Sequence, residues 1–218
     1  MRINLKQRAT PLSIGITGGI GSGKTAAAKI FGTLGAKVLF ADEIASRLID
    51  GERETRNRIK RALGPGALLP DGSLDRKAVA KLVFNDDRLK ARLDEIVHPA
   101  VLAAIGGEIT RFRRSGKEPM LMVEAAILYE AHAEDLFDYV IVIDAPEKDR
   151  IERVMTRDHS SRAEVLQRMR AQLPAAAKVA RADFVVRNSG DLRTLAQHCR
   201  FVHRILTGLA SSGHPPSA

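Results

Sequence analysis

The sequence predicts an α/β fold in which helices flank a parallel sheet. Short aliphatic runs of strand length alternate with longer amphipathic stretches along most of the chain, as in βαβ units. A glycine-rich segment directly follows the first run, and acidic residues end others. Because ligands in such sheets lie beyond the carboxyl ends of the strands, these observations predict a ligand site at that edge.

Five strands are expected, because five short runs are rich in Val, Ile, Leu, Met and Phe. They cover residues 12–17, 36–40, 120–123, 139–143 and 184–186. Glu124 and Asp144 directly follow the third and fourth runs. The sheet should therefore present carboxylates at the same edge as the glycine-rich segment.

The helices are expected between these strands. They are predicted at residues 25–31, 43–50, 147–157, from 161 onward, and 191–209. Ser161 and Glu164 have the spacing of a capping box at the start of the fourth of these helices. A helix-rich stretch, about 43–114, separates the second and third strands. In it His98-Pro99 predicts a kink or a boundary, because the residue before proline avoids the helical conformation.

The 218 residues suit one domain with inserted lobes. The domain is expected at 13–210, with its core at about 13–50, 117–153 and 180–210. A helical lobe (about 51–116) and a small lid (about 154–179) complete it. Residues 1–12 are expected to form a basic N-terminal extension, and residues 211–218 a disordered tail.

Composition restricts the partners and the compartment. The net charge of +9 favours anionic ligands, and the even spread of Lys and Arg favours small phosphorylated ligands over nucleic acid. No apolar run reaches membrane-spanning length, and the first residues do not resemble a secretory signal. One cysteine, Cys199, excludes a disulfide within the chain, which indicates the cytoplasm. It shares a predicted apolar helix face with Leu192, Leu195, Val202 and Leu206.

The glycine-rich segment matches the phosphate-binding loop. Residues 18–25 read Gly-Gly-Ile-Gly-Ser-Gly-Lys-Thr, which fills every fixed position of G-x-x-x-x-G-K-[ST] between a strand and a helix. Backbone N–H groups at a helix N-terminus bind phosphate, and glycines let the ligand approach them. The predicted ATP-binding residues are Gly18, Gly19, Ile20, Gly21, Ser22, Gly23, Lys24 and Thr25. Lys24 would reach the β and γ phosphates, and Thr25 would bind Mg²⁺.

Three acids lie where the strands end. Asp42 follows the second strand, and it fits two roles equally well: a base that orients and deprotonates an acceptor hydroxyl, or an N-cap of the helix at 43–50. Glu124 is the preferred second ligand of Mg²⁺, since Asp144 begins a segment that looks like a helix start.

Arginines follow the fourth strand in a segment that could close over the nucleotide. Arg153, Arg157 and Arg162 could stabilise charge on a transferred phosphoryl group, with Arg157 and Arg162 favoured. The alternative is a solvated basic helix face. His98 lies in an apolar context, which by itself favours a packing role.

Other nucleotide-binding classes fit less well. A dinucleotide-binding unit would need a third glycine where Lys24 stands. The D-x-x-G and N-K-x-D motifs of GTPases are absent from the sequence. A small kinase of the nucleoside monophosphate kinase type remains, with a nucleotide-switched binding protein as the alternative outside enzymes.

Several segments, in order, resemble the dephospho-coenzyme A kinase family. They are residues 16–25, 38–42, 71–76, 83–84, 93–99, 124–130 and 182–190, together with Arg157-Asp158, Arg162 and Gln172. The sequence departs from the family pattern at Phe40, Ser46 and Arg187. The resemblance covers about residues 13–190, nearly all of the expected folded part.

The resemblance implies a P-loop kinase-type parallel five-stranded sheet and ATP-dependent phosphorylation of the ribose 3′-hydroxyl of dephospho-CoA. It implies Asp42 as the acid that meets this hydroxyl and Asn188 as a contact to adenine. It also implies that Arg76, His98 and Glu124 bind the substrate. ATP and Mg²⁺ are the expected cofactors, without nucleic-acid or membrane partners, in a monomer or weak homo-oligomer.

Overall fold

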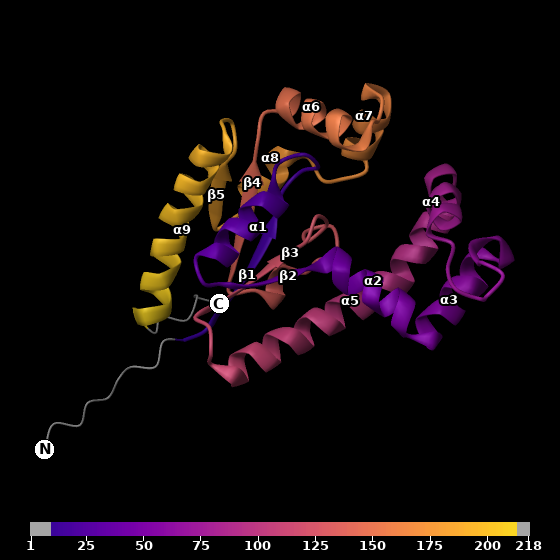
Figure 1. The fold of residues 1–218 in the computed structure, drawn as a ribbon, viewed down its shortest axis with the longest axis horizontal. Coiled ribbons are helices and arrows are strands. Elements are labelled where there is room, and N and C mark those ends of the chain that lie inside the picture. The colour runs from indigo at the N-terminus through magenta and orange to yellow at the C-terminus, as the bar shows by residue number, and fades with distance from the viewer. Residues whose placement is uncertain (1–9, 213–218) are drawn as a thin grey trace, which may run out of the picture. The chain divides into compact units, whose positions relative to one another are not determined.

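The computed structural model describes residues 10–212, apart from the side chains of residues 84 and 85. Most of the predicted basic extension (1–12) and the end of the predicted tail (211–218) lie outside the described residues. Within them, the strand and helix pattern follows the predicted order (Figure 1). The chain separates into two compact units, residues 41–108 and the remainder.

The larger unit contains the predicted five-stranded parallel sheet. Its spatial order is β2 (Lys37–Phe40), β3 (Met120–Glu124), β1 (Leu12–Thr17), β4 (Tyr139–Asp144) and β5 (Phe184–Arg187). All neighbouring strands are parallel. Glu124 is paired in register with Ile16 and with Phe40. The carboxyl ends of β1, β2 and β3 therefore coincide, as the fold class requires.

Two helices cover one face of this sheet. α1 (Lys24–Thr33) and α9 (Leu192–Ser212) contact each other and the strands (Figure 1). Their shared core contains Phe31, Leu206 and Cys199, all fully buried. Cys199 was predicted on this apolar face. Leu192 was expected on this apolar face but is 66% exposed, because it is the first residue of α9 and lies at the end of the packed stripe.

The helix α9 extends beyond its predicted end. Ser211 and Ser212 were assigned to the disordered tail, but both are helical. Their hydroxyl groups donate to the carbonyls of Thr207 and Leu209, which stabilises the last turn. Leu12 was assigned both to the extension and to the first strand, and it belongs to β1, where it is buried.

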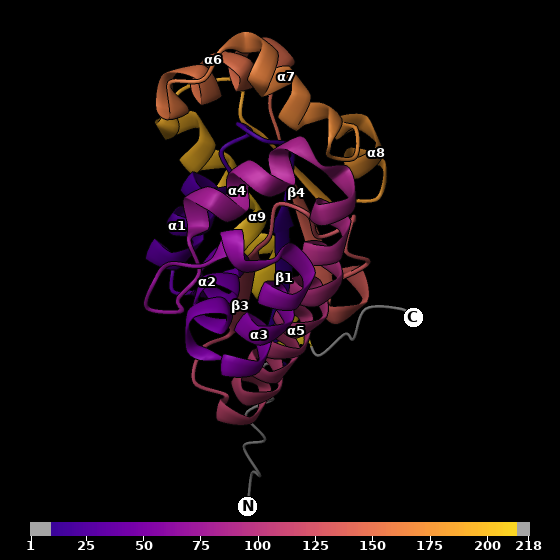
Figure 2. The same ribbon diagram turned by 90° about the vertical axis from the view of Figure 1, so that its right-hand side faces the viewer.

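Three helices lie between β4 and β5 in the sequence. They are α6 (Glu147–Asp158), α7 (Arg162–Arg170) and α8 (Ala175–Ala180). α6 and α7 lie together in Figures 1 and 2, and α8 contacts β4. The capping box is confirmed, because Ser161 Oγ accepts from the N–H of Glu164 while the Glu164 carboxylate accepts from the N–H of Ser161. Val165 packs against Val154, which joins α7 to α6.

The smaller unit is helical. It holds α2 (Ala41–Gly51), α3 (Arg53–Leu63), α4 (Arg76–Asn85) and α5 (Asp87–Ser115) up to residue 108. Its own core centres on Ile59, Leu63, Ala67 and Ile96. The unit overlaps the predicted lobe (about 51–116) but begins and ends earlier in the chain, since α2 follows β2 directly.

The predicted boundary at His98-Pro99 is wrong. α5 continues without a break from Asp87 to Ser115 and contains Pro99 in its interior. A proline removes one helical hydrogen bond, but the twenty-nine-residue helix continues past Pro99. It has buried apolar residues on both sides of the proline, Ile96 before it and Ile105 and Ile109 after it. The amphipathic pattern therefore outweighs the local cost of the proline.

Candidate active site

The glycine-rich segment forms a preshaped loop between β1 and α1. Gly21 and Gly23 have φ angles of 77° and 95°, a left-handed backbone region that favours glycine. Gly23 is the N-cap of α1, so the loop ends at the helix terminus where unpaired N–H groups point outward. This is the arrangement that the sequence motif predicts for a phosphate site.

Lys24 is positioned within this loop rather than in solvent. Its ammonium Nζ donates to the carbonyl of Gly19 at 3.2 Å, and the residue is 9% exposed. Thr25 is exposed in the first turn of α1. A charged amine held against the loop and a hydroxyl beside it can serve an incoming polyphosphate.

The glycines also let α6 pack closely against the loop, a contact that the sequence did not predict. A Cβ on Gly21 would lie 2.4 Å from the carbonyl oxygen of Arg150 and 2.9 Å from Val154 Cγ2. A Cβ on Gly19 would lie 2.5 Å from Arg150 Nη1. Packing of α6 therefore favours glycine at positions 19 and 21, in addition to any requirement from the ligand.

Asn188 connects the loop to the sheet. Its Nδ2 donates to the carbonyl of Ser22 at 2.8 Å, and its N–H donates to the carbonyl of Asp144 at 2.7 Å. Arg153 extends this connection, because its Nη2 donates to the Asn188 carbonyl at 3.2 Å and its Nη1 to the Gly21 carbonyl at 3.5 Å. Asn188 thus lies beside the loop, and an adenine contact for it stays a prediction.

Glu124 lies at the end of β3 and is 8% exposed. Its register with Ile16 places it next to the strand that leads into the loop. Asp144, the rejected alternative, has its Oδ2 3.2 Å from Nη1 of Arg187. Within residues 10–212, no three His, Cys, Asp or Glu residues form a metal-binding group. A cation here would depend on few protein ligands.

Of the two favoured lid arginines, Arg157 already has an acidic partner. Arg157 forms a double hydrogen bond with Asp158, at 2.7 and 3.0 Å, and Arg168 also binds Asp158 at 2.7 Å. Hydrogen bonds from Arg157 and then Arg168 hold the pKa of Asp158 well below its usual range. Arg162 is exposed at the start of α7. Arg150 and Arg153 are the arginines that contact the loop.

The segment after α7 is fixed by Gln172 and Glu130, which belong to the segments that resemble the family, and by Lys178, which the sequence interpretation did not single out. Gln172 Oε1 accepts the N–H of Ile20 in the loop at 2.9 Å. Glu130 Oε1 accepts the N–H of Leu173 at 2.9 Å and lies 2.8 Å from the ammonium of Lys178, which is fully buried. The lysine follows three alanines in α8, a pattern that gives no sign of burial.

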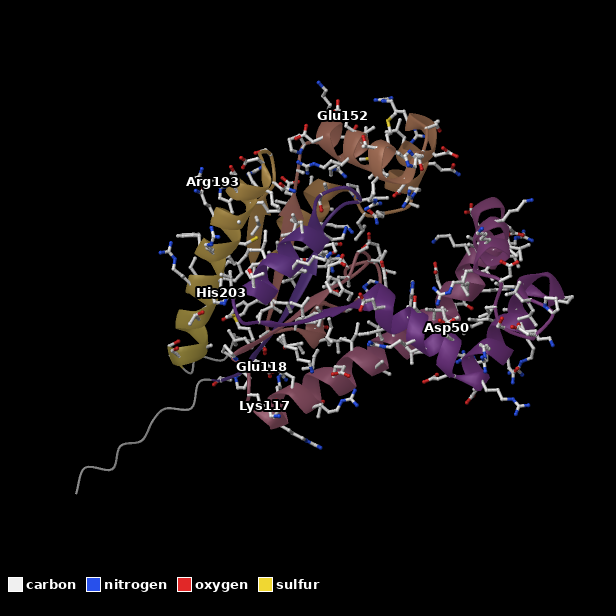
Figure 3. All side chains as sticks on the ribbon, viewed as in Figure 1. Asp50, Lys117, Glu118, Glu152, Arg193 and His203 are labelled. Atoms are coloured by element: carbon white, nitrogen blue, oxygen red, sulfur yellow. The ribbon has the colours of Figure 1, made fainter. Side chains whose placement is uncertain are left out.

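The predicted residues of the helical unit lie on three helices. Asp42 is in the first turn of α2, which begins at Ala41, so the N-cap interpretation of Asp42 is wrong. Arg76 donates to Ser46 Oγ at 3.0 Å and to Asp50 at 2.7 Å (Asp50 is labelled in Figure 3).

His98, also in this unit, lies on α5. Its Nε2 is 3.5 Å from Asp94 Oδ1, and its side chain is 30% exposed. It is therefore not a fully buried packing residue.

The fold and the loop together define a phosphate-loop nucleotide-binding protein. A shikimate kinase from Acinetobacter baumannii shares the fold, with a TM-score of 0.51 and 17% identity over 92% of this chain and 96% of that chain. The sheet order, the loop after β1 and the acid at the end of the neighbouring strand fit this class.

The family follows from closer relatives. The family model described as dephospho-CoA kinase matches residues 12–194, and the chain belongs to this family. A dephospho-CoA kinase from Geobacter sulfurreducens is 41% identical over 177 residues, 81% of this chain and 89% of that protein. A crystal structure of a Thermus thermophilus protein has a TM-score of 0.74 and 38% identity, covering 90% of this chain and 98% of that chain.

Family membership makes the chain an ATP-dependent kinase and favours this function over a nucleotide-switched binding protein. Among the helices within residues 10–212, none is both long and apolar enough to cross a membrane.

Proposed function

We propose that this protein transfers the γ-phosphoryl group of ATP to the ribose 3′-hydroxyl of dephospho-CoA, which yields CoA and ADP. The observation that carries the proposal is the preshaped loop, in which the Lys24 ammonium is held against the Gly19 carbonyl at 3.2 Å. The acceptor follows from the family whose model matches residues 12–194.

The chain's residues would act mainly by position and charge. Backbone N–H groups of residues 19–24 would bind the β phosphate, and Lys24 would bridge the β and γ phosphates. Asp42 would orient the acceptor hydroxyl and take its proton. Because phosphoryl transfer has a loose transition state, alignment and electrostatic stabilisation supply most of the rate.

The donor set suits Mg²⁺. Thr25 offers a hydroxyl oxygen and Glu124 a carboxylate, and hard oxygen ligands are what Mg²⁺ prefers. This ion usually keeps several waters and binds substrate phosphates, so two protein ligands suffice. When bound, Mg²⁺ would neutralise charge on the β and γ oxygens.

The remaining assignments extend this proposal. Arg76 and His98 would bind dephospho-CoA from the helical unit, with Glu124 at the sheet edge. Arg157 and Arg162 would close over the nucleotide with the lid, which requires Arg157 to exchange its Asp158 partner. We also expect a monomer or weak homo-oligomer that works in the cytoplasm, without nucleic-acid or membrane partners.

An acceptor screen tests the proposal. Purified protein with ATP and Mg²⁺ would be offered dephospho-CoA, nucleoside monophosphates or shikimate, and ADP release would be followed. We expect turnover with dephospho-CoA to exceed that with the others by orders of magnitude. Preference for another acceptor would overturn the substrate assignment while leaving the kinase class intact.

A further inference from the structure

Arg150 on α6 is a buried arginine with no acidic partner. It is 7% exposed, although arginine is almost never fully buried unless it is paired. Its Nε donates to the carbonyl of Ala145 at 3.1 Å. Within residues 10–212, no carboxylate forms an ion pair with it. A charged group in this position requires an explanation.

The guanidinium is directed at the phosphate loop. A Cβ on Gly19 would lie 2.5 Å from Arg150 Nη1 and 3.4 Å from its Cζ. The same Gly19 accepts the Lys24 ammonium through its carbonyl. Two cations therefore meet at one residue of the loop, one from α1 and one from α6. The outer residue Glu152, by contrast, is exposed on α6 (Figure 3).

Arg150 also borders a cavity. An open cavity of about 690 Å³ is lined by Gly19, Arg150, Arg170 and Gln172, with Glu147 and apolar residues of α7 and α8. Glu147 is exposed and forms no ion pair with Arg150. Two of the residues that line the cavity, Arg150 and Gln172, contact the loop.

A buried, unpaired charge is costly in a protein interior. Phosphoryl oxygens would supply the missing counter-charge, and the planar fork of an arginine matches them with paired hydrogen bonds. We propose that Arg150 is a further phosphoryl-binding residue, whose guanidinium binds oxygen atoms of the polyphosphate tail held by the loop. The inference rests on the proposed function only in taking that tail to belong to a nucleotide.

Calorimetric titration of ATP and of adenosine tests this inference. Arg150→Met keeps the aliphatic stem and removes the charge, Arg150→Lys keeps the charge, and Lys148→Met removes an exposed cation from the same helix. We expect Arg150→Met to weaken ATP binding about 10- to 100-fold, the range for a charged hydrogen bond. Adenosine affinity should stay unchanged, Arg150→Lys should recover part of the loss, and Lys148→Met should stay within about twofold of wild type.

A role limited to packing would give another result. Both Arg150 variants would then lose ATP affinity equally, and the salt dependence of ATP binding would match that of wild type. Such an outcome, or wild-type affinity in Arg150→Met, overturns the inference. Failure of the wild-type protein to bind ATP would instead contradict the proposed function, so the two failures are distinguishable.

Discussion

Asp42 is the residue on which the chemistry of the proposed reaction depends most. Asp42→Asn keeps the size of the side chain but removes its basicity. We expect ATP affinity close to wild type and turnover lowered about 10²–10⁴-fold, the usual range for a general base. Steady-state rates with dephospho-CoA would measure this effect.

The neighbouring Glu43→Gln is the matched control for Asp42→Asn, because Glu43 is also exposed in the first turn of α2. It should turn over at the wild-type rate. If Asp42→Asn did so too, Asp42 would have no part in proton removal.

Gly21 should be intolerant of a side chain for two reasons. Its φ is 77°, and an added Cβ would meet the Arg150 carbonyl at 2.4 Å. Gly35 is a matched control, since its φ is 96° but nothing lies within 4 Å of an added Cβ. Gly35→Ala should cost about 1–2 kcal/mol from the backbone alone, and Gly21→Ala about 1–3 kcal/mol more from overpacking. Chemical denaturation of both variants measures the difference in their free energies of unfolding. Equal losses would show that α6 moves to accommodate the added methyl group.

The sequence could predict the loop because its chemistry lies in adjacent residues. Gly23, Lys24 and Thr25 follow a rule that needs no tertiary information. Arg150 could not be predicted in this way, because its role depends on α6 packing against a loop more than a hundred residues earlier. The spacing of Arg150 and Arg153 could have indicated a shared role, because residues three apart lie on one face of a helix.

At the scale of elements, the segment between α7 and β5 depends on a buried ion pair. Lys178 is fully buried and donates to Glu130 at 2.8 Å and to the Ala126 carbonyl at 2.9 Å. Removing one partner leaves the other uncompensated, which typically costs about 3–5 kcal/mol. We therefore expect Lys178→Met to be strongly destabilising in urea denaturation.

A double-mutant cycle with Lys178→Met and Glu130→Leu measures the interaction energy between the two side chains apart from their other contacts. The double variant should be more stable than Lys178→Met alone, since no buried charge would remain unpaired. Additive losses in the cycle would mean that Lys178 and Glu130 act independently. The Gln172 contact to the loop lies in the same segment, so the variants should also weaken ATP binding.

The junction of α6 and α7 should resist acid. Arg157 and Arg168 lower the pKa of Asp158, so its stabilising contribution is complete above the ordinary aspartate pKa and is lost as pH falls through the lowered value. Between about pH 8 and 5 the difference in Tm between wild type and Asp158→Asn should stay constant and small, because the pairs are partly exposed. It should shrink below about pH 4. A difference that disappears near pH 6 would contradict the pairing.

For the molecule as a whole, the succession of strands and helices along the chain could be predicted because it follows from local apolar patterns. The division at residues 41 and 108 could not, since it places all of α2 in the smaller unit and falls within α5, whereas the lobe was expected at about 51–116. Pro99 illustrates the difficulty: its local preference predicts an interruption, whereas packing along α5 keeps the helix intact.

Cys199 should report on the unfolding of the larger unit. It is the only cysteine, it is fully buried in the core between α9 and the sheet, and burial raises the pKa of its thiol to about 11. At pH 8 the native thiol is therefore protonated and inaccessible, whereas an unfolded chain has an ordinary thiol pKa of about 8.5. A thiol reagent should label the native protein only through unfolding.

Nucleotide should then protect Cys199, although the proposed nucleotide site is the loop and not the core around Cys199. A ligand that binds only the folded state stabilises it in proportion to ln(1 + [L]/Kd), so ATP at about 100 times its Kd should slow labelling about 100-fold when reclosing is fast. Adenosine at the same multiple of its own Kd is the control and should protect equally. Rapid labelling without denaturant, or labelling insensitive to ATP, would show that α9 opens locally and that the core around Cys199 is not coupled to the loop.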